Sequence, residues 1–306
     1  MTIRIALIGF GKIASEQHLP AITADPRFTL AAICTPGADP ELGVPCFASS
    51  DAMFDAMAGQ LDAVAVCTPP AVRFALACNA ILAGCDVLLE KPPATTLGEL
   101  DALTELAGKH YRSVYAAWHS QHAPGVAQAA AALAGHDISM LDICWREDVR
   151  RWHPGQDWIW KPGGFGVFDP GINALAIASR IIEAPLLVRE AKLLVPDNKQ
   201  VPIAASIKFA GNAMTAEMDW RPTPHEEWTV CVRTLNGQTV ELRNGGSLLS
   251  IDGVEQQLTG PSSYPAIYNR FAELCAGQEI EIDRKPLRIV ADIFMVGSFN
   301  SIESFD

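Results

Sequence analysis

The sequence predicts an α/β protein with two parts: a doubly wound parallel sheet at the N-terminus, followed by an α+β domain with an open, mainly antiparallel sheet. Three observations lead to this prediction. Short aliphatic runs alternate with helical patterns over the first third of the chain, a glycine-rich turn follows the first run, and strand-like runs separated by hairpin dipeptides fill much of the remainder. We therefore expect two domains, over residues 1–120 and 121–306.

The first part alternates strands and helices in the order that produces a parallel sheet. Apolar and β-branched runs predict strands at 3–8, 28–33, 63–67, 87–90 and 113–118, and helical periodicity predicts helices near 13–24, 51–58, 71–83 and 96–109. Local signals support two helix ends. Thr96 and Glu99 have the spacing of a capping box, and Gly84 suits the position after a helix C-cap.

The pattern changes after about residue 120. The next predicted elements are an alanine-rich helix from Pro124, a strand at 138–145 and a helix near 170–182. Asn236-Gly237 and Asp252-Gly253 each separate two strand-like runs, so an antiparallel meander is predicted between about 186 and 258. Amphipathic patterns predict two closing helices, near 265–276 and 286–299.

Composition excludes several classes of partner. The 306 residues carry a formal net charge of −12 with no run of Lys and Arg, which disfavours nucleic acid and anionic membranes. No apolar run approaches the roughly 18 residues of a membrane span, and the N-terminus enters a strand-like segment without a secretory signal, so a soluble, cytoplasmic protein is expected. The eight cysteines form no C-x-x-C pair, which favours reduced core thiols, and no metal site is expected.

A glycine-rich turn follows the first predicted strand. Gly9, Gly11 and Ala14 match G-x-G-x-x-[G/A]: Gly9 permits a tight turn, Gly11 lets the backbone approach a pyrophosphate, and Ala14 allows close helix packing. A purely structural glycine turn is the alternative. In this β-α-β context the motif predicts a Rossmann dinucleotide-binding domain over 1–120, with Gly9, Gly11, Lys12 and Ile13 at the cofactor.

The end of the second predicted strand bears on the choice of cofactor. NAD-binding folds usually place a carboxylate there for the ribose, whereas NADP-binding folds place an arginine nearby. Here the position reads Cys34-Thr35-Pro36-Gly37, and the nearest acid, Asp39, is expected in the following loop. Thr35 can hydrogen-bond either ribose, so NAD is expected and NADP stays open.

Two further motifs carry candidate catalytic groups. Lys91 follows a predicted strand at the carboxyl edge of the sheet, where doubly wound folds bind ligands, and it can take part in proton transfer there. An exposed loop lysine is the alternative. Asp169 and Asn173 are four residues apart at the start of an apolar helix, so both project from one face. An N-cap role for Asp169 is the alternative, but it leaves Asn173 unexplained.

Together the motifs GFGKIA, EKPP and GGFGVFDPGIN resemble those of the glucose-fructose oxidoreductase, inositol dehydrogenase and rhizopine-catabolism (Gfo/Idh/MocA) family, and the resemblance extends over essentially the whole chain. Within the family, residues 145–156 are similar to those of bacterial aldose 1-dehydrogenases that act on D-galactose or L-arabinose. Many relatives carry a histidine as acid/base where this chain has Asn173. That departure assigns the proton chemistry to Lys91 and Asp169, and the sequence does not distinguish which of them is the immediate base.

The resemblance implies an NAD(P)-dependent oxidoreductase that oxidises an aldose at C1 to the lactone: D-galactose, with L-arabinose or D-fucose as further substrates. It implies a C-terminal domain, 121–306, that binds substrate and mediates contacts in a homo-oligomer, a dimer or tetramer. The expected catalytic residues are Lys91, Asp169 and Asn173, and the expected sugar contacts are His119, Glu147, Trp152 and His153. The expected cofactor contacts add Thr35, Cys67, Thr68, Pro69, Glu90 and Lys91 to those of the glycine turn. An inositol or other ring-hydroxyl dehydrogenase and a non-catalytic NAD(P)-binding regulator are the alternatives.

Overall fold

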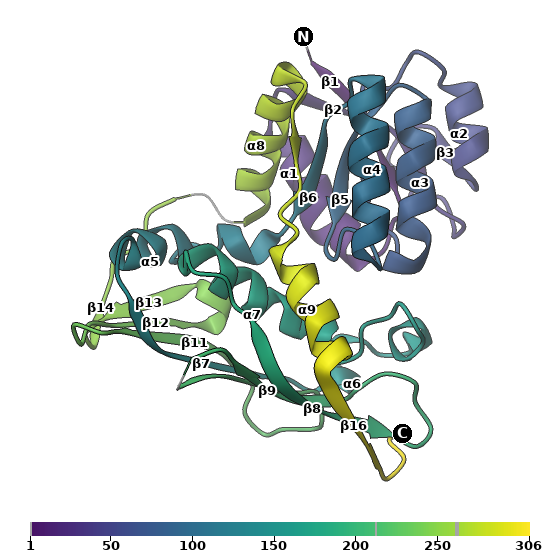
Figure 1. The fold of residues 1–306 in the computed structure, drawn as a ribbon. Coiled ribbons are helices and arrows are strands. Elements are labelled where there is room, and N and C mark those ends of the chain that lie inside the picture. The colour runs from purple at the N-terminus through teal and green to yellow at the C-terminus, as the bar shows by residue number, and fades with distance from the viewer. Residues whose placement is uncertain (1, 212, 261–262) are drawn as a thin grey trace. The chain divides into compact units, whose positions relative to one another are not determined.

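The computed structural model describes residues 2–211, 213–260 and 263–306, and the chain divides into two compact units (Figure 1). The first unit comprises the chain up to Trp118 together with Tyr264–Arg284, and the second comprises His119–Ser263 together with Lys285–Asp306. This division places the first boundary after Trp118, two residues before the predicted one, and differs in one larger respect. Residues 264–284, expected in the second domain, pack in the first unit.

A parallel sheet forms the centre of the first unit. Within the described part of the chain, seven strands lie in the order β15-β6-β5-β4-β1-β2-β3, and every neighbouring pair is parallel. The strands are β1 (Ile3–Ile8), β2 (Phe28–Cys34), β3 (Cys46–Phe47), β4 (Ala63–Val66), β5 (Asp86–Glu90), β6 (Val114–Ala117) and β15 (Ile280–Glu281). The predicted doubly wound sheet is confirmed. The order reverses between β1 and β4, which is where such sheets bind ligands.

Helices cover both faces of this sheet because alternate strand residues point to opposite sides. They are η1 (Ala14–His18), α1 (Leu19–Ala24), α2 (Ser50–Ala56), α3 (Pro70–Leu82), α4 (Leu97–His110) and α8 (Ser263–Gly277). Ile8 and Val66 belong to the core under α2, α3 and α4, whereas Ile5 and Leu7 belong to the core shared with α1 and α8. Helix α4 begins with the predicted capping box of Thr96 and Glu99.

Helix α8 returns to the first unit because its apolar face fits that sheet. Tyr264, Ile267, Tyr268 and Phe271 are buried in one core with residues of β1, β4 and β5. The amphipathic pattern predicted the helix but could not specify which sheet it covers. After α8, the short strand β15 extends the parallel sheet beside β6.

A mixed sheet forms the second unit. Its nine strands, counted over the described residues, lie in the order β14-β13-β12-β11-β7-β10-β9-β8-β16. They are β7 (Ile138–Arg146), β8 (Val188–Pro196), β9 (Ala204–Phe209), β10 (Met214–Asp219), β11 (Glu227–Thr234), β12 (Thr239–Arg243), β13 (Leu248–Ile251), β14 (Val254–Glu255) and β16 (Gly297–Ile302). The β7–β10 and β8–β16 pairs are parallel and the rest are antiparallel, so the mainly antiparallel sheet is confirmed.

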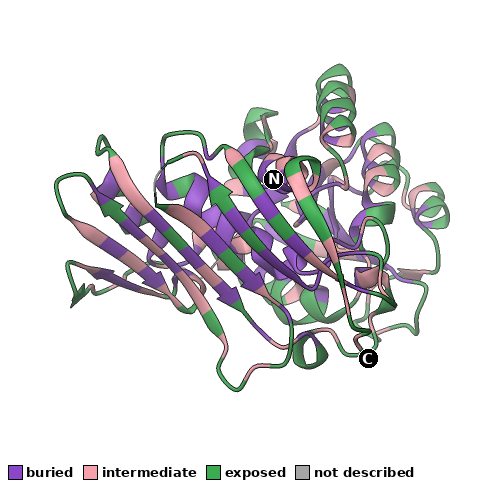
Figure 2. Ribbon diagram, turned by 60° about the horizontal axis from the view of Figure 1, so that its bottom comes forward, coloured by how far each residue is buried: buried purple, intermediate pink, exposed green. Residues whose placement is uncertain are grey.

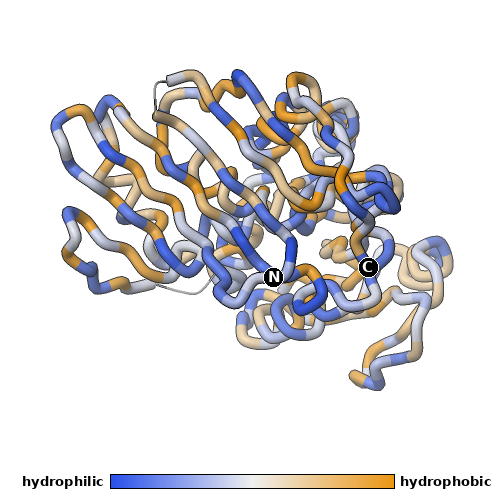
Figure 3. The backbone as a smooth tube through the Cα atoms, turned by 90° about the horizontal axis from the view of Figure 1, so that it is seen from below, coloured by the Kyte–Doolittle hydropathy of each residue, from blue (hydrophilic) through white to orange (hydrophobic). Residues whose placement is uncertain are grey.

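One face of this sheet carries helices. These are η2 (His119–His122), α5 (Val126–Leu133), α6 (Val149–Trp152), η3 (Asp157–Trp160), α7 (Phe168–Ile181), η4 (Asn244–Gly246) and α9 (Lys285–Val296). Helix α5 packs on β12, helix α7 packs on β7 and β11, and helix α9 packs on β8. Buried and exposed residues alternate along the strands (Figure 2), and hydrophobic and hydrophilic residues alternate in step (Figure 3). The strands therefore bury one face and expose a polar one, as at the pair Ile143 and Asp142.

Local predictions hold in the second unit with two exceptions. The predicted antiparallel meander is interrupted, because β7 lies between β10 and β11 and pairs in parallel with β10. Asn236-Gly237 joins β11 to β12 and Asp252-Gly253 joins β13 to β14, both as antiparallel hairpins. The last predicted helix ends earlier, at Val296, and 297–302 form β16, an edge strand beside β8. No helix within the described ranges is long and apolar enough to cross a membrane.

Candidate active site

The glycine turn fixes the end of β1 against the end of β4. Gly9 has φ +87°, a conformation that side chains rarely adopt, and its N–H donates to the Cys34 carbonyl at 2.7 Å. A Cβ at Gly9 would lie 2.9 Å from Thr68 Cγ2 and 3.0 Å from the Thr68 nitrogen. Only glycine allows these two strand ends to approach so closely.

The helical segment after this turn suits an anion. Gly11, Lys12 and Ile13 are exposed at its start, and a Cβ at Gly11 would meet no atom within 4 Å. Ala14 is fully buried, so the helix packs closely on the sheet. Because the first N–H groups of a helix lack internal acceptors, a pyrophosphate can bind there. The residues present therefore fit a dinucleotide: open backbone at Gly11 and a tight turn at Gly9.

The other predicted cofactor contacts lie at the ends of β2 and β4. Thr35 follows β2, and its Oγ1 accepts a hydrogen bond from the Gly37 N–H at 3.4 Å. Asp39 lies in the following loop, as expected, where it accepts from the Glu41 N–H at 2.8 Å. The segment Cys67-Thr68-Pro69 joins β4 to α3. These positions are at the carboxyl edge of the sheet, and their contact with the cofactor stays a prediction.

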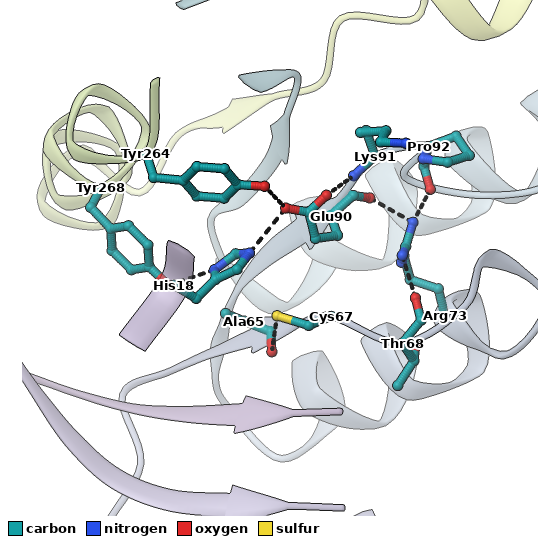
Figure 4. Close-up of polar contacts among 10 residues, drawn as sticks. All are labelled: His18, Ala65, Cys67, Thr68, Arg73, Glu90, Lys91, Pro92, Tyr264 and Tyr268. Atoms are coloured by element: carbon teal, nitrogen blue, oxygen red, sulfur yellow. Dashed lines mark hydrogen bonds and ion pairs between the residues drawn. The ribbon is translucent and has the colours of Figure 1, made fainter. Parts of the chain in front are cut away.

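Lys91 lies directly after β5, above a buried polar network (Figure 4). Its N–H donates to Glu90 Oε2 at 2.8 Å. The other carboxylate oxygen, Oε1, contacts His18 Nε2 at 3.0 Å and accepts a hydrogen bond from the Tyr264 hydroxyl. His18 Nδ1 contacts the Tyr268 hydroxyl at 2.8 Å. His18, from η1, and Tyr264 and Tyr268, from α8, therefore converge on one carboxylate.

The ionisation of this network follows from its surroundings. Burial alone would lower the pKa of His18, but Cys67, Tyr268 and Glu90 face the ring and together raise that pKa well above its ordinary value. Burial also raises the pKa of Tyr268 to about 12 and that of Tyr264 well above its usual value, so both phenols stay protonated. An imidazolium therefore donates from both ring nitrogens, one of them to the Glu90 carboxylate.

A buried guanidinium fixes the backbone on the other side of Lys91. Arg73, from α3, donates to the Glu90 carbonyl at 2.7 Å and also to the carbonyls of Pro92 and Thr68. It is only 3% exposed, so these carbonyls replace the water it has lost. The loops after β4 and β5 are thereby joined through one side chain.

In the second unit, Asp169 lies in the first turn of α7. The N-cap of this helix is Val167 and no side chain caps it, so the N-cap alternative for Asp169 is wrong. The carboxylate is buried, and its Oδ2 lies 3.4 Å from His153 Nε2. Asn173 lies one turn later on the same face, and its buried Oδ1 has no hydrogen-bond partner among the described residues. Asp169, Asn173 and His153 therefore form one polar cluster.

Glu147 follows β7 and is held by two indoles. Its Oε1 accepts from Trp220 Nε1 at 3.1 Å and its Oε2 accepts from Trp228 Nε1 at 2.9 Å. The His153 ring packs edge-on against Trp220, with ring centroids 5.2 Å apart, so this carboxylate adjoins the Asp169 cluster. Each oxygen of Glu147 keeps lone pairs for a further donor.

Trp152 is the exposed tryptophan of this region. Its indole N–H donates to Glu226 Oε1 at 2.7 Å, and its ring lies edge-on to Trp228 with centroids 5.8 Å apart. His119 begins η2, which packs against α7. The structure thus brings His153, Asp169 and Asn173 together, and Trp220 connects Glu147 to them. Lys91 belongs to the first unit, and its convergence with Asp169 stays a prediction.

The sequence missed the residues that support these groups. His18, Arg73 and Tyr264 hold the loop at Lys91, and Trp220 and Trp228 hold Glu147. One signal was present in the sequence. His18 and Arg73 each lie among apolar residues of a predicted helix, and a polar side chain that is buried needs a hydrogen-bond partner. The partners themselves lie up to 250 residues away and could not be identified from spacing.

Comparison with known proteins decides the family. The model of an oxidoreductase family with an NAD-binding Rossmann fold matches residues 3–117. Over 306 residues, 99% of this chain and 98% of the relative, the sequence is 45% identical to galactose 1-dehydrogenase of Pseudomonas fluorescens. The chain belongs to the Gfo/Idh/MocA oxidoreductase family. The resemblance predicted from the three motifs is confirmed, and the first unit is the family's NAD-binding Rossmann fold.

Solved structures agree with this assignment. The D-galactose-1-dehydrogenase of Rhizobium etli matches with a TM-score of 0.92 and 44% identity, covering 100% of this chain and 98% of that one. A 3-ketoreductase of Actinomadura kijaniata, solved with NADP and TDP-benzene, matches with a TM-score of 0.85 at 17% identity, over 99% and 100% of the two chains. At that identity the second match supports the fold alone.

The glycine turn predicts two different outcomes for two similar substitutions. Gly9→Ala should lower the free energy of unfolding by about 1–3 kcal/mol, because it combines a positive φ with a backbone clash. Gly11→Ala should leave that free energy unchanged but weaken NAD binding, because its methyl group would occupy the approach to the pyrophosphate. Denaturant unfolding and calorimetric titration with NAD measure both effects. Wild-type NAD affinity in Gly11→Ala would contradict this account of the turn.

The raised pKa of His18 predicts a pH-dependent stability. Because the pKa of folded His18 lies well above its ordinary value of 6.5, the imidazolium contributes fully to stability below pH 6.5 and loses that contribution as the pH rises through the folded pKa. His18→Gln should therefore lower the free energy of unfolding by about 3 kcal/mol near pH 6. The difference from wild type should shrink as the pH rises. Exposed His110→Gln is the control. If the difference in the free energy of unfolding between wild type and His18→Gln grows with pH, His18 is not the stabilising imidazolium.

Proposed function

We propose that this chain is an aldose 1-dehydrogenase that oxidises D-galactose at C1 to the lactone, with L-arabinose and D-fucose as further substrates. The observation that carries the proposal is the 45% identity with galactose 1-dehydrogenase over nearly all of both chains. The three sugars have the same configuration from C2 to C4 and differ in the group on C5. A single extra group in a pocket changes selectivity by only about 1–3 kcal/mol, so one site accepts all three.

The polar groups of the second unit suit a sugar. The buried Oδ1 of Asn173, which lacks a partner among the described residues, needs a donor, and a sugar hydroxyl supplies one. Glu147 can accept hydrogen bonds from vicinal hydroxyls, and His153 can donate or accept them. Exposed Trp152 offers an apolar face for sugar C–H groups. His119, at the start of η2, contributes a further hydrogen-bonding group.

Proton transfer falls to Lys91 and Asp169 in this proposal. The bound nicotinamide supplies one function, acceptance of the hydride from the sugar. Either Asp169 or Lys91 accepts the proton of the anomeric hydroxyl as the hydride leaves C1. If Asp169 is the base, the protonated Lys91 stabilises the negative charge that develops on that oxygen, and Asn173 orients it. His153, 3.4 Å from Asp169 Oδ2, holds the carboxylate in place.

The proposed roles of the two units follow from the candidate residues that each unit carries. The first unit holds the dinucleotide through the glycine turn, Thr35, the segment from Cys67 to Pro69, and Lys91. We favour NAD because no arginine follows β2. NADP stays open, because the carboxylate typical of NAD binding is also missing and Thr35 can hydrogen-bond either ribose. The second unit binds the sugar, and its sheet forms the contacts of a dimer or tetramer in the cytoplasm.

A substrate screen tests the proposal. The reduction of NAD and of NADP is followed by absorbance against a panel of aldoses and inositols, and the product is identified as lactone. D-galactose with NAD should give the highest kcat/KM. Activity confined to inositols would contradict C1 oxidation, and an absence of reduction with every sugar would leave a non-catalytic regulator.

Two substitutions test the residue assignment. Lys91→Ala and Asp169→Ala should each lower kcat by at least about a hundredfold, which is the scale of general acid/base assistance. The matched controls are exposed Lys109→Ala on α4 and exposed Asp142→Ala on β7, which should retain wild-type kcat. Near-normal turnover in either test variant would contradict the proton-transfer role.

A further inference from the structure

The peptide that carries Lys91 is held from both sides by buried groups. On one side, the Glu90 carboxylate accepts the Lys91 N–H at 2.8 Å. On the other, Arg73 donates to the carbonyls of Glu90 and Pro92, the residues that flank Lys91 in sequence. The orientation of the lysine backbone therefore depends on two charged side chains beneath it (Figure 4).

Glu90 itself is fixed from two distant parts of the chain. It is 3% exposed, and its Oε1 lies 3.0 Å from Nε2 of His18, which is fully buried. The Tyr264 hydroxyl donates to the same oxygen from the start of α8. Because two donors share one oxygen and the backbone N–H occupies the other, the carboxylate plane has a single orientation.

A purely structural role does not account for so many buried polar groups. A buried charged pair seldom adds stability over apolar side chains of similar volume, because desolvation offsets the attraction. The neighbouring strands β1 and β4 end in apolar residues, Ile8 and Val66, whereas β5 ends in Glu90. The polar groups are concentrated beneath the one strand end that carries the lysine.

We propose that Glu90, His18 and Tyr264 are positioning residues that set the backbone orientation of Lys91, and thereby the direction of its amine, during sugar oxidation. The expected decrease in kcat rests on the proposed function. The expected change in the position of Lys91 does not. Glu90 acts through the Lys91 peptide in this account. Its side chain, expected among the cofactor contacts, is instead buried against His18 and Tyr264.

Kinetics of Glu90→Gln and Tyr264→Phe test the proposal. Glu90→Gln keeps the side-chain shape but removes the charge that faces His18, so kcat should fall about ten- to a hundredfold, as expected for a displaced catalytic group. The KM for NAD should change much less than kcat, because the glycine turn and Thr35, which are proposed to hold the cofactor, do not contact this network. Tyr264→Phe removes one donor and should cause a smaller decrease in kcat.

Ser113→Ala is the matched control. The Ser113 hydroxyl is buried and donates to the Leu274 carbonyl at 2.9 Å, so it ties the opposite end of α8 to the sheet without contacting the network. Its removal should lower the free energy of unfolding and leave kcat unchanged. Wild-type kcat in Glu90→Gln, or an equal decrease in Ser113→Ala, would overturn the proposal.

A second measurement does not depend on the sugar. The lysines are labelled by reductive methylation with ¹³C, and the Lys91 signal is assigned by its loss in Lys91→Arg. In Glu90→Gln the Lys91 methyl signal should shift while that of exposed Lys109 does not. If no sugar is oxidised by the wild type, the proposed function fails and this shift still decides the positioning role; an unmoved Lys91 signal would overturn it.

Discussion

A buried carboxylate is stable only when donors replace the water that it has lost, and Glu90 imposes this requirement on the first unit. The donors come from three places: His18 on η1, Tyr264 on α8 and the Lys91 N–H on the loop itself. Helix α8 must therefore return to the parallel sheet, although all strands of the second unit's sheet except β16 precede it in the chain. The return is also favoured by the apolar face that α8 buries with β1, β4 and β5.

The second unit places its polar groups on regular elements. Asp169 and Asn173 lie on α7, and Glu147 lies at the end of β7, where two indoles fix its carboxylate. Groups held in this way lose little conformational freedom on binding, which favours a precise arrangement around a small polar ligand. Both units thus hold several candidate functional groups through buried polar contacts, whereas Lys12, Ile13 and Trp152 are exposed.

The sequence predicted those features whose causes are local. The strands, the capping box at Thr96 and the hairpins at Asn236 and Asp252 follow from residues adjacent in the chain. The glycine turn, Lys91 and Asp169 could also be singled out, because motif and context are local. The return of α8, the parallel β7–β10 pair and the Glu90 network depend on contacts between distant residues. An amphipathic pattern predicts that a helix buries one face, but it does not predict which sheet that face packs against.

The central claim is that Lys91, from the first unit, and Asp169, from the second, act on one sugar hydroxyl. A crystal structure of the full chain with NADH and D-galactose bound together measures this directly. The account predicts that Lys91 Nζ and an Asp169 carboxylate oxygen each lie within about 3.2 Å of the anomeric oxygen, or are joined to it through one water. A sugar bound away from either group, or the two groups facing separate surfaces, would contradict it.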